Sequence, residues 1–411
     1  MPLPVPVGTL HLADKFVFGP VCLGLTLVRY CLPWRRPPGE FRPRKLVFVK
    51  LAEQGSTVLA VAAIQHAVSL VGRENTYFVA FEENRFILDV MDLIPSENVL
   101  TVRTQSLSTM IFDSLRAIRR MHRLDIDTAV DLEFLARFSA AITYLSGARW
   151  RSGMHGYFGE GPYRGDLMTH RVLYNAHIHT GEMFLCLVEA LQLPAAQLPT
   201  FGRRVDLPGE TTPTFTPSSE EREQWTARLC GMIHTSELPR IILLNPNAGD
   251  MIPLRRWPTE NYAALAKRLL AAFPEVQVIM TGGPSETMST LLLASGVGDP
   301  RCFSLAGRTT LRELLVLYTL SEVLVTNDSG PAHFATLTPI RVVTLFGPET
   351  PQLFAACTER NTPLWAGIAC SPCVNALNNR QSACRNNLCM QALTVDQVFE
   401  ATARAYRAKI Q

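Results

Sequence analysis

Alternation between short apolar runs and longer helical segments constrains the fold of this chain more than any other feature. In the first half, short runs rich in β-forming residues occupy 45–50, 75–81, 98–103 and 127–134. Each is followed by a segment with apolar residues at helical spacing. Strands that alternate with helices of this length form βαβ units around a mostly parallel sheet. A doubly wound, Rossmann-like domain is therefore expected.

The second half repeats the alternation after a break. Residues 206–219 are rich in proline, threonine and serine and lack periodicity, which is typical of a linker. Strand-like runs then occupy 240–246, 276–283, 322–326 and 341–347, with helical spacing at 259–273 and 310–320. The expected fold class is α/β, with two Rossmann-like doubly wound parallel-sheet domains facing a cleft, where ligands bind outside the carboxyl ends of the strands.

Domain boundaries follow from these patterns. We expect an apolar N-terminal segment and connector (1–44), a first domain (45–205), a linker and helix (206–235), a second domain (236–392) and a C-terminal helix (393–411). Thr394 and Gln397 form a plausible capping box at the start of the last helix. The net charge of +3, from 39 basic and 36 acidic residues, argues against nucleic acid as the main partner.

The N-terminal segment has an uncharged run at 16–28, followed by Trp34, Arg35 and Arg36. The run is shorter than the roughly 20 apolar residues of a simple membrane span. We interpret it as an interfacial anchor on the cytoplasmic face of a membrane, with the tryptophan and arginines at headgroup level. The alternative is a helix packed on the globular body.

The stretch "VTNDSGPAHF" (325–334) places Asp328, Ser329 and His333 close together, as a hydrolase would. A nucleophile elbow needs glycine two residues before the serine, and Asn327 occupies that position. The stretch instead follows a strand and begins a helix, which Asp328 or Ser329 can cap. A helix start at the end of a strand suits a phosphate, and Gly330 allows close approach of the backbone. The alternative is an ordinary cap with a structural histidine.

Two neighbouring turns extend this interpretation. Arg255 and Arg256 precede the helix start at Trp257–Pro258, and arginine is well suited to phosphate oxygens. Strand 276–283 ends in a Gly-Gly turn that leads into another helix start. The expected donor-binding residues are Gly55, Asn247, Arg256, Gly282, Gly283, Glu286, Asp328, Ser329, Gly330 and His333.

The motif D-S-G-P-x-H at 328–333, with "LFGPETP" (345–351) and the W-P helix start, resembles glycosyltransferase family 9, the heptosyltransferases of bacterial lipopolysaccharide synthesis. The resemblance is strong in the C-terminal half and extends into the first half through 46–64. It implies a GT-B fold, an N-terminal acceptor domain and a C-terminal nucleotide-sugar domain. It also implies metal-independent, inverting transfer of a heptose or similar sugar. The donor would be a nucleotide-sugar, typically ADP-heptose, and the acceptor a hydroxyl of a lipid-linked saccharide at the cytoplasmic leaflet.

The resemblance also assigns roles in catalysis. Arg255 stands where the family usually has a phosphate-binding lysine. The family usually reads G-D after the first strand, with the aspartate as base, whereas this chain reads Gly55–Ser56. An attacking hydroxyl must lose its proton, and serine cannot accept it unaided. Glu53 is the expected substitute; the alternative is a solvated loop carboxylate. The predicted catalytic residues are thus Glu53, Ser56 and Arg255.

Four cysteines, Cys370, Cys373, Cys384 and Cys389, lie within one loop (370–389). They could form a structural zinc site or two disulfides. The chain has no signal-peptide pattern, so a reducing cytoplasm and hence zinc are favoured over disulfides. Similar cysteine groups in relatives suggest a structural loop, and no cofactor is expected for catalysis.

Histidines also gather in residues 154–182, at His155, His170, His177 and His179, together with Tyr157, Tyr163 and Arg164. This segment suits stacking on an acceptor sugar, or is an ordinary surface loop. Two rival functions remain: an epimerase that acts on the nucleotide-sugar alone, and a non-catalytic nucleotide-sugar-binding protein. A dinucleotide oxidoreductase is disfavoured because no G-x-G-x-x-G follows either first strand.

Overall fold

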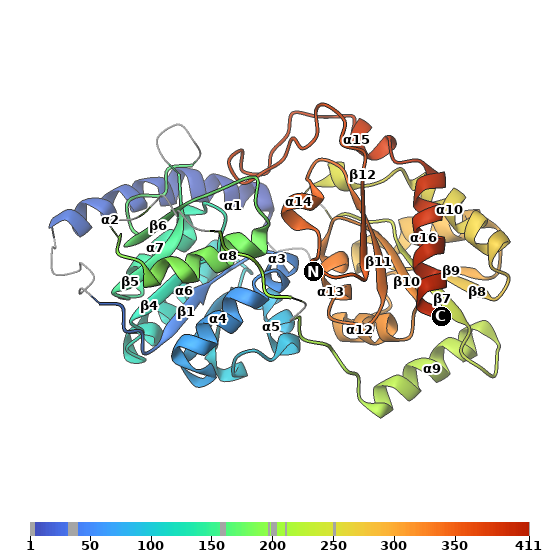
Figure 1. Ribbon diagram of the computed structural model, residues 1–411, viewed down its shortest axis with the longest axis horizontal. Coiled ribbons are helices and arrows are strands. Elements are labelled where there is room, and N and C mark those ends of the chain that lie inside the picture. Colours follow the sequence, from blue (N-terminus) through green and yellow to red (C-terminus); the bar gives the residue numbers. More distant parts are fainter. Residues whose placement is uncertain are drawn as a thin grey trace. The chain divides into compact units, whose positions relative to one another are not determined.

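The computed structural model describes residues 5–31, 40–156, 162–195, 198, 204–209, 212–249 and 252–410. Trp34, Arg35, Arg36 and Tyr157 therefore lie outside the described residues. The chain forms two compact units (Figure 1). Unit 1 comprises Met1–Thr211 and Asn375–Gln381, and unit 2 comprises Thr212–Val374 and Ser382–Gln411.

Unit 1 contains a six-stranded sheet with the order β3-β2-β1-β4-β5-β6, and every recorded pairing is parallel. The strands are β1 (Leu46–Val49), β2 (Thr76–Phe81), β3 (Val99–Val102), β4 (Thr128–Asp131), β5 (Trp150–His155) and β6 (His170–Leu173). Strands β1, β2 and β4 are buried along their whole length, as expected for a parallel sheet covered on both faces.

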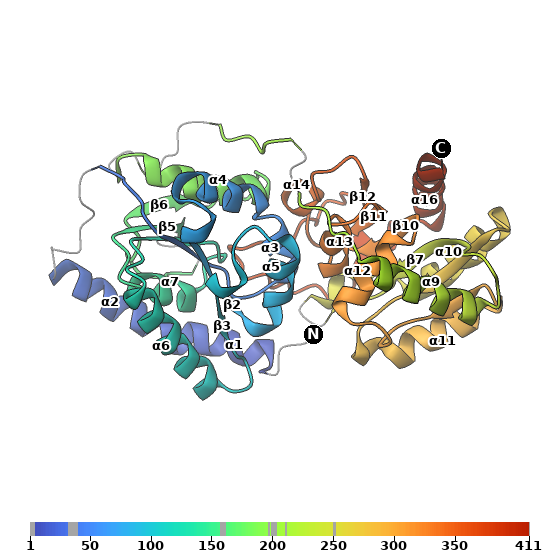
Figure 2. The same cartoon turned by 90° about the horizontal axis from the view of Figure 1, so that it is seen from below.

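Helices cover both faces of this sheet. They are α3 (Gln54–Val58), α4 (Val61–Val71), α5 (Arg85–Met91), α6 (Leu107–Arg123), α7 (Arg137–Leu145) and α8 (Thr180–Glu189). Figure 2 shows α4 on one side of the sheet and α6 and α7 on the other. Short 3₁₀ turns at Arg73–Asn75, Glu82–Asn84, Ser96–Asn98 and Ala190–Gln192 join these elements.

Unit 2 repeats the topology, with the sheet order β12-β11-β10-β7-β8-β9. Its strands are β7 (Arg240–Asn245), β8 (Val276–Met280), β9 (Cys302–Ser304), β10 (Val323–Asn327), β11 (Arg341–Phe346) and β12 (Asn361–Trp365). Its helices are α9 (Ser219–Ile233), α10 (Thr259–Ala272), α11 (Thr287–Val297), α12 (Leu311–Thr319), α13 (Gly330–Ala335), α14 (Pro351–Phe354), α15 (Leu388–Gln391) and α16 (Val395–Ile410), with 3₁₀ turns at Pro253–Arg255 and Pro284–Glu286. Both units have the Rossmann strand order, which confirms the predicted fold class.

The structure adds four strands that the sequence patterns did not predict: β5, β6, β9 and β12. Strands β5 and β6 lie at one end of the unit 1 sheet, and β9 and β12 are the two edge strands of the unit 2 sheet. They carry polar residues such as Arg151 and Ser304. The predicted strands occupy central positions or have continuous apolar runs. Sequence patterns detect continuous apolar runs, and β5 ("WRSGMH") has none although that strand is almost fully buried.

Two segments refine the expected organisation. The range 206–235 contains the crossing between units, and its second half is helix α9. Segment 375–381, within the expected second domain, groups with unit 1. The capping box at the last helix is confirmed, since Gln397 N donates to Thr394 Oγ1 at 3.2 Å and Thr394 N donates to Gln397 Oε1 at 3.0 Å.

The N-terminal segment forms a continuous helix made of α1 (Val7–Ala13), a π-helical turn (Asp14–Phe18) and α2 (Gly19–Cys31). By length and composition alone, the 24-residue stretch Gly8–Cys31 is long and apolar enough to cross a membrane. The helix thus extends well beyond the uncharged run, and contacts between α2 and α7 join it to unit 1.

Candidate active site

Each sheet has a topological switch point, where successive strands leave in opposite directions and ligands of such folds bind. In unit 2 this point lies between β7 and β10, and in unit 1 between β1 and β4. Nearly all the predicted catalytic and donor-binding residues follow strands at or beside these two points.

Asn327 joins the turns of the unit 2 switch point. Its side chain is fully buried, and its Oδ1 accepts hydrogen bonds from Trp257 N at 3.1 Å and Tyr262 Oη at 3.2 Å. Its Nδ2 donates to Asn247 O at 3.0 Å. Asn327, whose place in the sequence argued against a nucleophile elbow, therefore holds the helix start at Trp257–Pro258 beside the ends of β7 and β10.

Arg255 lies between two carboxylates at this point. Its guanidinium forms an ion pair with Glu349, and its Nε lies 3.5 Å from Asp328 Oδ2. Glu349 is fully buried and the Arg255 side chain is only 14% exposed. Sequence patterns missed Glu349, although it stands in the "LFGPETP" motif directly after β11. The structure thus brings together Arg255 and Asp328, two of the predicted site residues.

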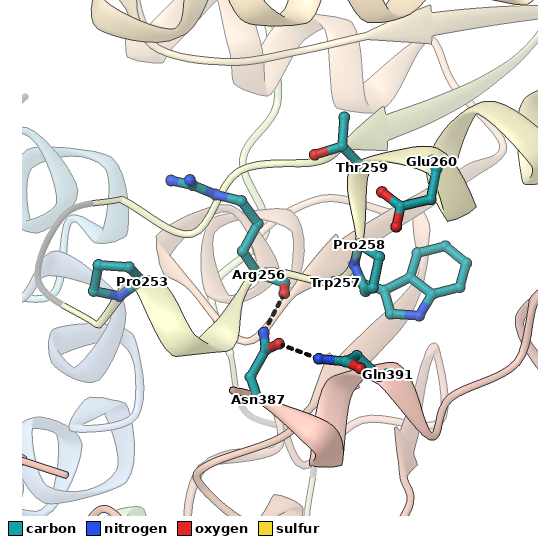
Figure 3. A pocket seen from close by; sticks show the side chains of 8 residues that line it. All are labelled: Pro253, Arg256, Trp257, Pro258, Thr259, Glu260, Asn387 and Gln391. Atoms are coloured by element: carbon teal, nitrogen blue, oxygen red, sulfur yellow. Dashed lines mark hydrogen bonds between the residues drawn. The ribbon is translucent and has the colours of Figure 1, made fainter. Parts of the chain in front are cut away.

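Arg256 differs from its neighbour because it is exposed and lines a shallow pocket of about 520 Å³. Figure 3 shows its side chain pointing away from Asn387, whose Nδ2 donates to Arg256 O at 2.8 Å. The other lining residues are Pro253, Trp257, Pro258, Thr259, Glu260 and Gln391. Arg255 and Asp328 are not among them, so the pocket and the charged cluster are separate features.

Asn247, Gly282 and Glu286 form the other side of the unit 2 switch point. Asn247 Nδ2 donates to Thr281 O at 3.2 Å, and Glu286 Oε2 accepts from Gly283 N at 2.7 Å. A Cβ on Gly282 would lie 2.6 Å from Asn247 Nδ2 and 3.2 Å from Glu286 Oε2. Glycine is required here because the turn packs directly on these side chains.

The D-S-G-P-x-H motif begins α13, a helix of only six residues. Ser329, one of the two expected caps, occupies the N-cap position, and Pro331 lies in the first turn. The Ser329 hydroxyl, however, donates to Asn327 O at 3.2 Å instead of capping the helix. His333 is buried within α13.

The unit 1 switch point centres on Glu53. This residue follows β1 with φ 68° and ψ 80°, a left-handed conformation that non-glycine residues rarely adopt. Such outliers often mark functional sites. Ser56 Oγ lies 3.1 Å from Glu53 Oε2 and can donate to it, while Gly55 is buried in the first turn of α3.

A second carboxylate and a buried lysine support this loop. Glu133 Oε1 accepts from Leu51 N at 2.7 Å and from Ala52 N at 2.8 Å. Lys50 is fully buried, with its Nζ 3.5 Å from Glu133 Oε2 and 3.9 Å from Glu53 Oε2. Neither Lys50 nor Glu133 was predicted, although Lys50 ends the first apolar run.

Arg380 completes the cluster from the distant segment 375–381. It forms an ion pair with Glu53, 327 residues away in sequence, and its guanidinium lies 4.9 Å from the centre of the Phe134 ring. No sequence signal could have predicted this pair. It also means that Glu53 is not a solvated loop carboxylate, since its side chain is only 18% exposed.

The histidine-rich segment has mainly structural contacts. Arg164 forms a buried ion pair with Asp131 at the end of β4, and His179 Nδ1 accepts from Gly181 N at 3.1 Å at the start of α8. Burial lowers the pKa of His170 to about 4. Burial also raises the pKa of Asp131 to about 6, against the opposing effect of Arg164. These contacts favour the structural interpretation of Arg164, His170 and His179.

The cysteine loop contains free thiols at Cys370, Cys373, Cys384 and Cys389. Within the described ranges, no three His, Cys, Asp or Glu side chains are grouped so that they could hold a metal ion. The four thiols are not paired as disulfides in this structure.

Comparison with known proteins assigns these features to a family. A model described as glycosyltransferase family 9 (heptosyltransferase) matches residues 115–383. The chain belongs to glycosyltransferase family 9. Lipopolysaccharide heptosyltransferase 2 of Salmonella typhimurium is 27% identical over 215 residues, which cover 52% of this chain and 58% of that protein. The chain thus matches little more than half the length of this family 9 relative.

Solved structures agree on the fold. The ADP-heptose lipopolysaccharide heptosyltransferase II of E. coli has a TM-score of 0.66 at 19% identity, covering 89% of this chain and 100% of that one. A family 9 glycosyltransferase of Veillonella parvula has a TM-score of 0.67 at 17% identity, covering 90% and 99%. The two Rossmann-like units are thus the fold of this family.

Proposed function

We propose that the chain is an inverting glycosyltransferase that moves a heptose or similar sugar from a nucleotide-sugar, ADP-heptose, to a hydroxyl of a lipid-linked saccharide. The observation that carries this proposal is family 9 membership combined with a charged cluster at the switch point of each unit. The Salmonella typhimurium and E. coli proteins named above are heptosyltransferases, which supports heptose as the sugar.

Unit 2 binds the donor in this proposal. Arg255 contacts the diphosphate, and Glu349 and Asp328 hold its guanidinium in place from two sides. Asn247, Gly282, Gly283, Glu286, Ser329, Gly330 and His333 line the nucleotide-sugar around the ends of β7, β8 and β10. Stabilisation of the leaving diphosphate by these groups requires no divalent cation.

Unit 1 supplies the base. Glu53 accepts the proton of the attacking hydroxyl as the new glycosidic bond forms at the anomeric carbon and the nucleoside diphosphate leaves. Arg380 and Lys50 lie beside this carboxylate and hold it in place. Ser56 orients the carboxylate through its hydroxyl.

We also place the enzyme at the cytoplasmic face of the inner membrane. A lipid-linked acceptor is held there, and the N-terminal helix exposes apolar residues. Zinc in the cysteine loop remains a hypothesis for elemental analysis of the purified protein: about one equivalent of zinc would support it, and a metal-free preparation would contradict it.

The test is an assay of purified protein with ADP-heptose, with and without a heptose-deficient lipopolysaccharide acceptor. We expect a glycosylated acceptor and free ADP only when both substrates are present. Conversion of the nucleotide-sugar without acceptor would indicate an epimerase instead. Thermal stabilisation by nucleotide-sugars without turnover on any acceptor would indicate a binding protein.

A further inference from the structure

The outward face of the N-terminal helix is apolar over more than three turns. Between Phe16 and Val28, the exposed positions carry no charged or polar side chain; they are Phe16, Val17, Pro20, Val21, Leu23, Gly24, Leu27 and Val28. Phe16 is 65% exposed and Leu27 is 60% exposed. A surface helix of a soluble protein normally shows the opposite pattern, with polar residues outward. A patch of this kind marks an interaction surface.

The inward face of the same helix packs on unit 1 through a small apolar cluster that includes Cys22 and Leu25, with charged contacts near both ends. Asp14 Oδ1 accepts from the backbone N atoms of Arg137 and Phe138, both at 2.9 Å, and Asp14 Oδ2 lies 3.1 Å from Arg137 Nη1. At the other end, Arg29 Nη1 lies 2.9 Å from Asp166 Oδ1. Between them, Cys22 and Thr26 are buried. A transmembrane position would move these charged groups into hydrocarbon, so the contacts hold the helix along the surface of unit 1.

Helix α6 adds a second exposed apolar strip on the same side of the first sheet (Figure 2). Its first half exposes Leu107, Ile111, Phe112 and Leu115, with Phe112 61% exposed. Both α6 and the N-terminal helix contact α7, which is almost entirely buried between them and the sheet. Two apolar surfaces on one side of unit 1 are therefore available to one partner.

The charge on α6 indicates what kind of partner this surface fits. The second half of α6 exposes Arg116, Arg119, Arg120 and Arg123, while its one acidic residue, Asp113, is buried against Arg103. Exposed apolar residues beside clustered arginines fit a bilayer with anionic headgroups. A second copy of this chain would instead bring the same arginines together and be repelled.

We propose that the N-terminal helix and α6 together form an in-plane docking surface for an anionic lipid bilayer. The apolar residues between Phe16 and Val28, and those from Leu107 to Leu115, enter the headgroup boundary, and the α6 arginines bind lipid phosphates. This inference deepens the proposed membrane location and does not depend on catalysis.

Co-sedimentation of the full chain with vesicles tests it. We expect binding to phosphatidylcholine vesicles that contain phosphatidylglycerol, and weak binding to pure phosphatidylcholine. The double variant L23E/L27E should lower the partition coefficient at least about tenfold on both vesicles. The double variant R116E/R119E should lower the partition coefficient on anionic vesicles only, by about fivefold or more for each arginine replaced. Matched controls are M288E/L292E on exposed α11 positions and K267E/R404E on α10 and α16, all expected to bind as the parent chain does.

Each outcome is decisive. Loss of binding in both test variants, with normal far-UV circular dichroism and normal transfer to a water-soluble acceptor fragment, supports the surface. Unchanged vesicle binding in L23E/L27E overturns it. The proposal is also overturned if the test variants convert a stable dimer to a monomer without a change in vesicle binding, because the face would then be a self-association surface. If no acceptor is glycosylated at all but vesicle binding follows the expected pattern, the proposed function fails while the docking surface stands.

Discussion

The switch points of the two units have the same topology but different charge. In unit 1, two carboxylates, Glu53 and Glu133, lie close to two cations, Lys50 and Arg380. In unit 2, two carboxylates, Asp328 and Glu349, lie close to Arg255. The two units therefore share a Rossmann-like topology but carry charged clusters of different composition.

The difference suggests a division of labour. Arg255 is fixed from two sides, which suits a cation that must hold one position against a diphosphate. Glu53 is held in a left-handed loop by a residue from a remote segment, which suits a single carboxylate that must meet an acceptor hydroxyl. Four substitutions test this comparison, and they follow from the largest expected effect to the smallest.

Glu53→Gln tests the unit 1 cluster most directly. The amide keeps the shape but cannot accept a proton, so kcat for sugar transfer is expected to fall by about 10²- to 10⁴-fold. Steady-state assays with saturating donor measure this. Glu82→Gln, at an exposed position after neighbouring strand β2, is the matched control and should leave kcat unchanged. A normal rate of sugar transfer by the Glu53→Gln variant would show that Glu53 is not the base.

Arg164→Met tests whether unit 1 depends on its buried charges for stability. The substitution leaves Asp131 buried without its cation, and is expected to cost about 3 kcal/mol of unfolding free energy. Burial already raises the pKa of Asp131 to about 6, above its unfolded value. The contribution of this carboxyl to stability is therefore present below about pH 4 and lost as the pH rises through about 6.

Losing Arg164 raises this pKa further, so the destabilisation should be larger at pH 7.5 than at pH 5. Chemical denaturation at the two pH values measures it. The double variant D131N/R164M, which removes both charges, should recover much of the loss. Equal losses at both pH values would show that packing, not charge, is responsible.

Arg255→Ala tests the unit 2 cluster. Loss of charge-assisted contacts to the diphosphate is expected to weaken donor binding by about 10- to 100-fold. Isothermal titration with the nucleotide-sugar measures this. Arg256→Ala is the neighbouring comparison. The sequence patterns placed Arg256 among the donor-binding residues, but its side chain is exposed and lines a pocket that does not include Arg255 or Asp328, so we now expect donor affinity not to change. If Arg256→Ala were the damaging change, the donor would occupy the shallow pocket instead.

Ser56→Ala is expected to have the smallest effect. It removes one hydrogen bond from the Ser56 hydroxyl to the Glu53 carboxylate, worth about 1.5 kcal/mol, so kcat should fall only about tenfold. The same transfer assay measures it. Ser56→Asp offers a sharper version, because it restores the usual family residue. Rescue of Glu53→Gln by Ser56→Asp would show that either position can hold the base.

Patterns in the sequence predicted the sites unevenly. Asp328 and Gly282 were predicted because their turns follow apolar runs directly, and Arg255 because it precedes the helix start at Trp257–Pro258. Glu349 stands in the "LFGPETP" motif and Lys50 ends the apolar run 45–50, but neither has a distinctive spacing. Arg380 could not be predicted, because an ion pair across 327 residues depends on where a loop packs.

The sequence by itself determined the two Rossmann-like halves and the turns at their strand ends, because periodicity and turn chemistry are local properties. It also revealed an apolar N-terminal run. Only the tertiary structure decided that this run is part of a helix with charged contacts to unit 1 near both ends and apolar residues outward, and that Glu53 is held by Arg380. Burial and ion pairing are set by contacts between distant segments, which no local pattern encodes.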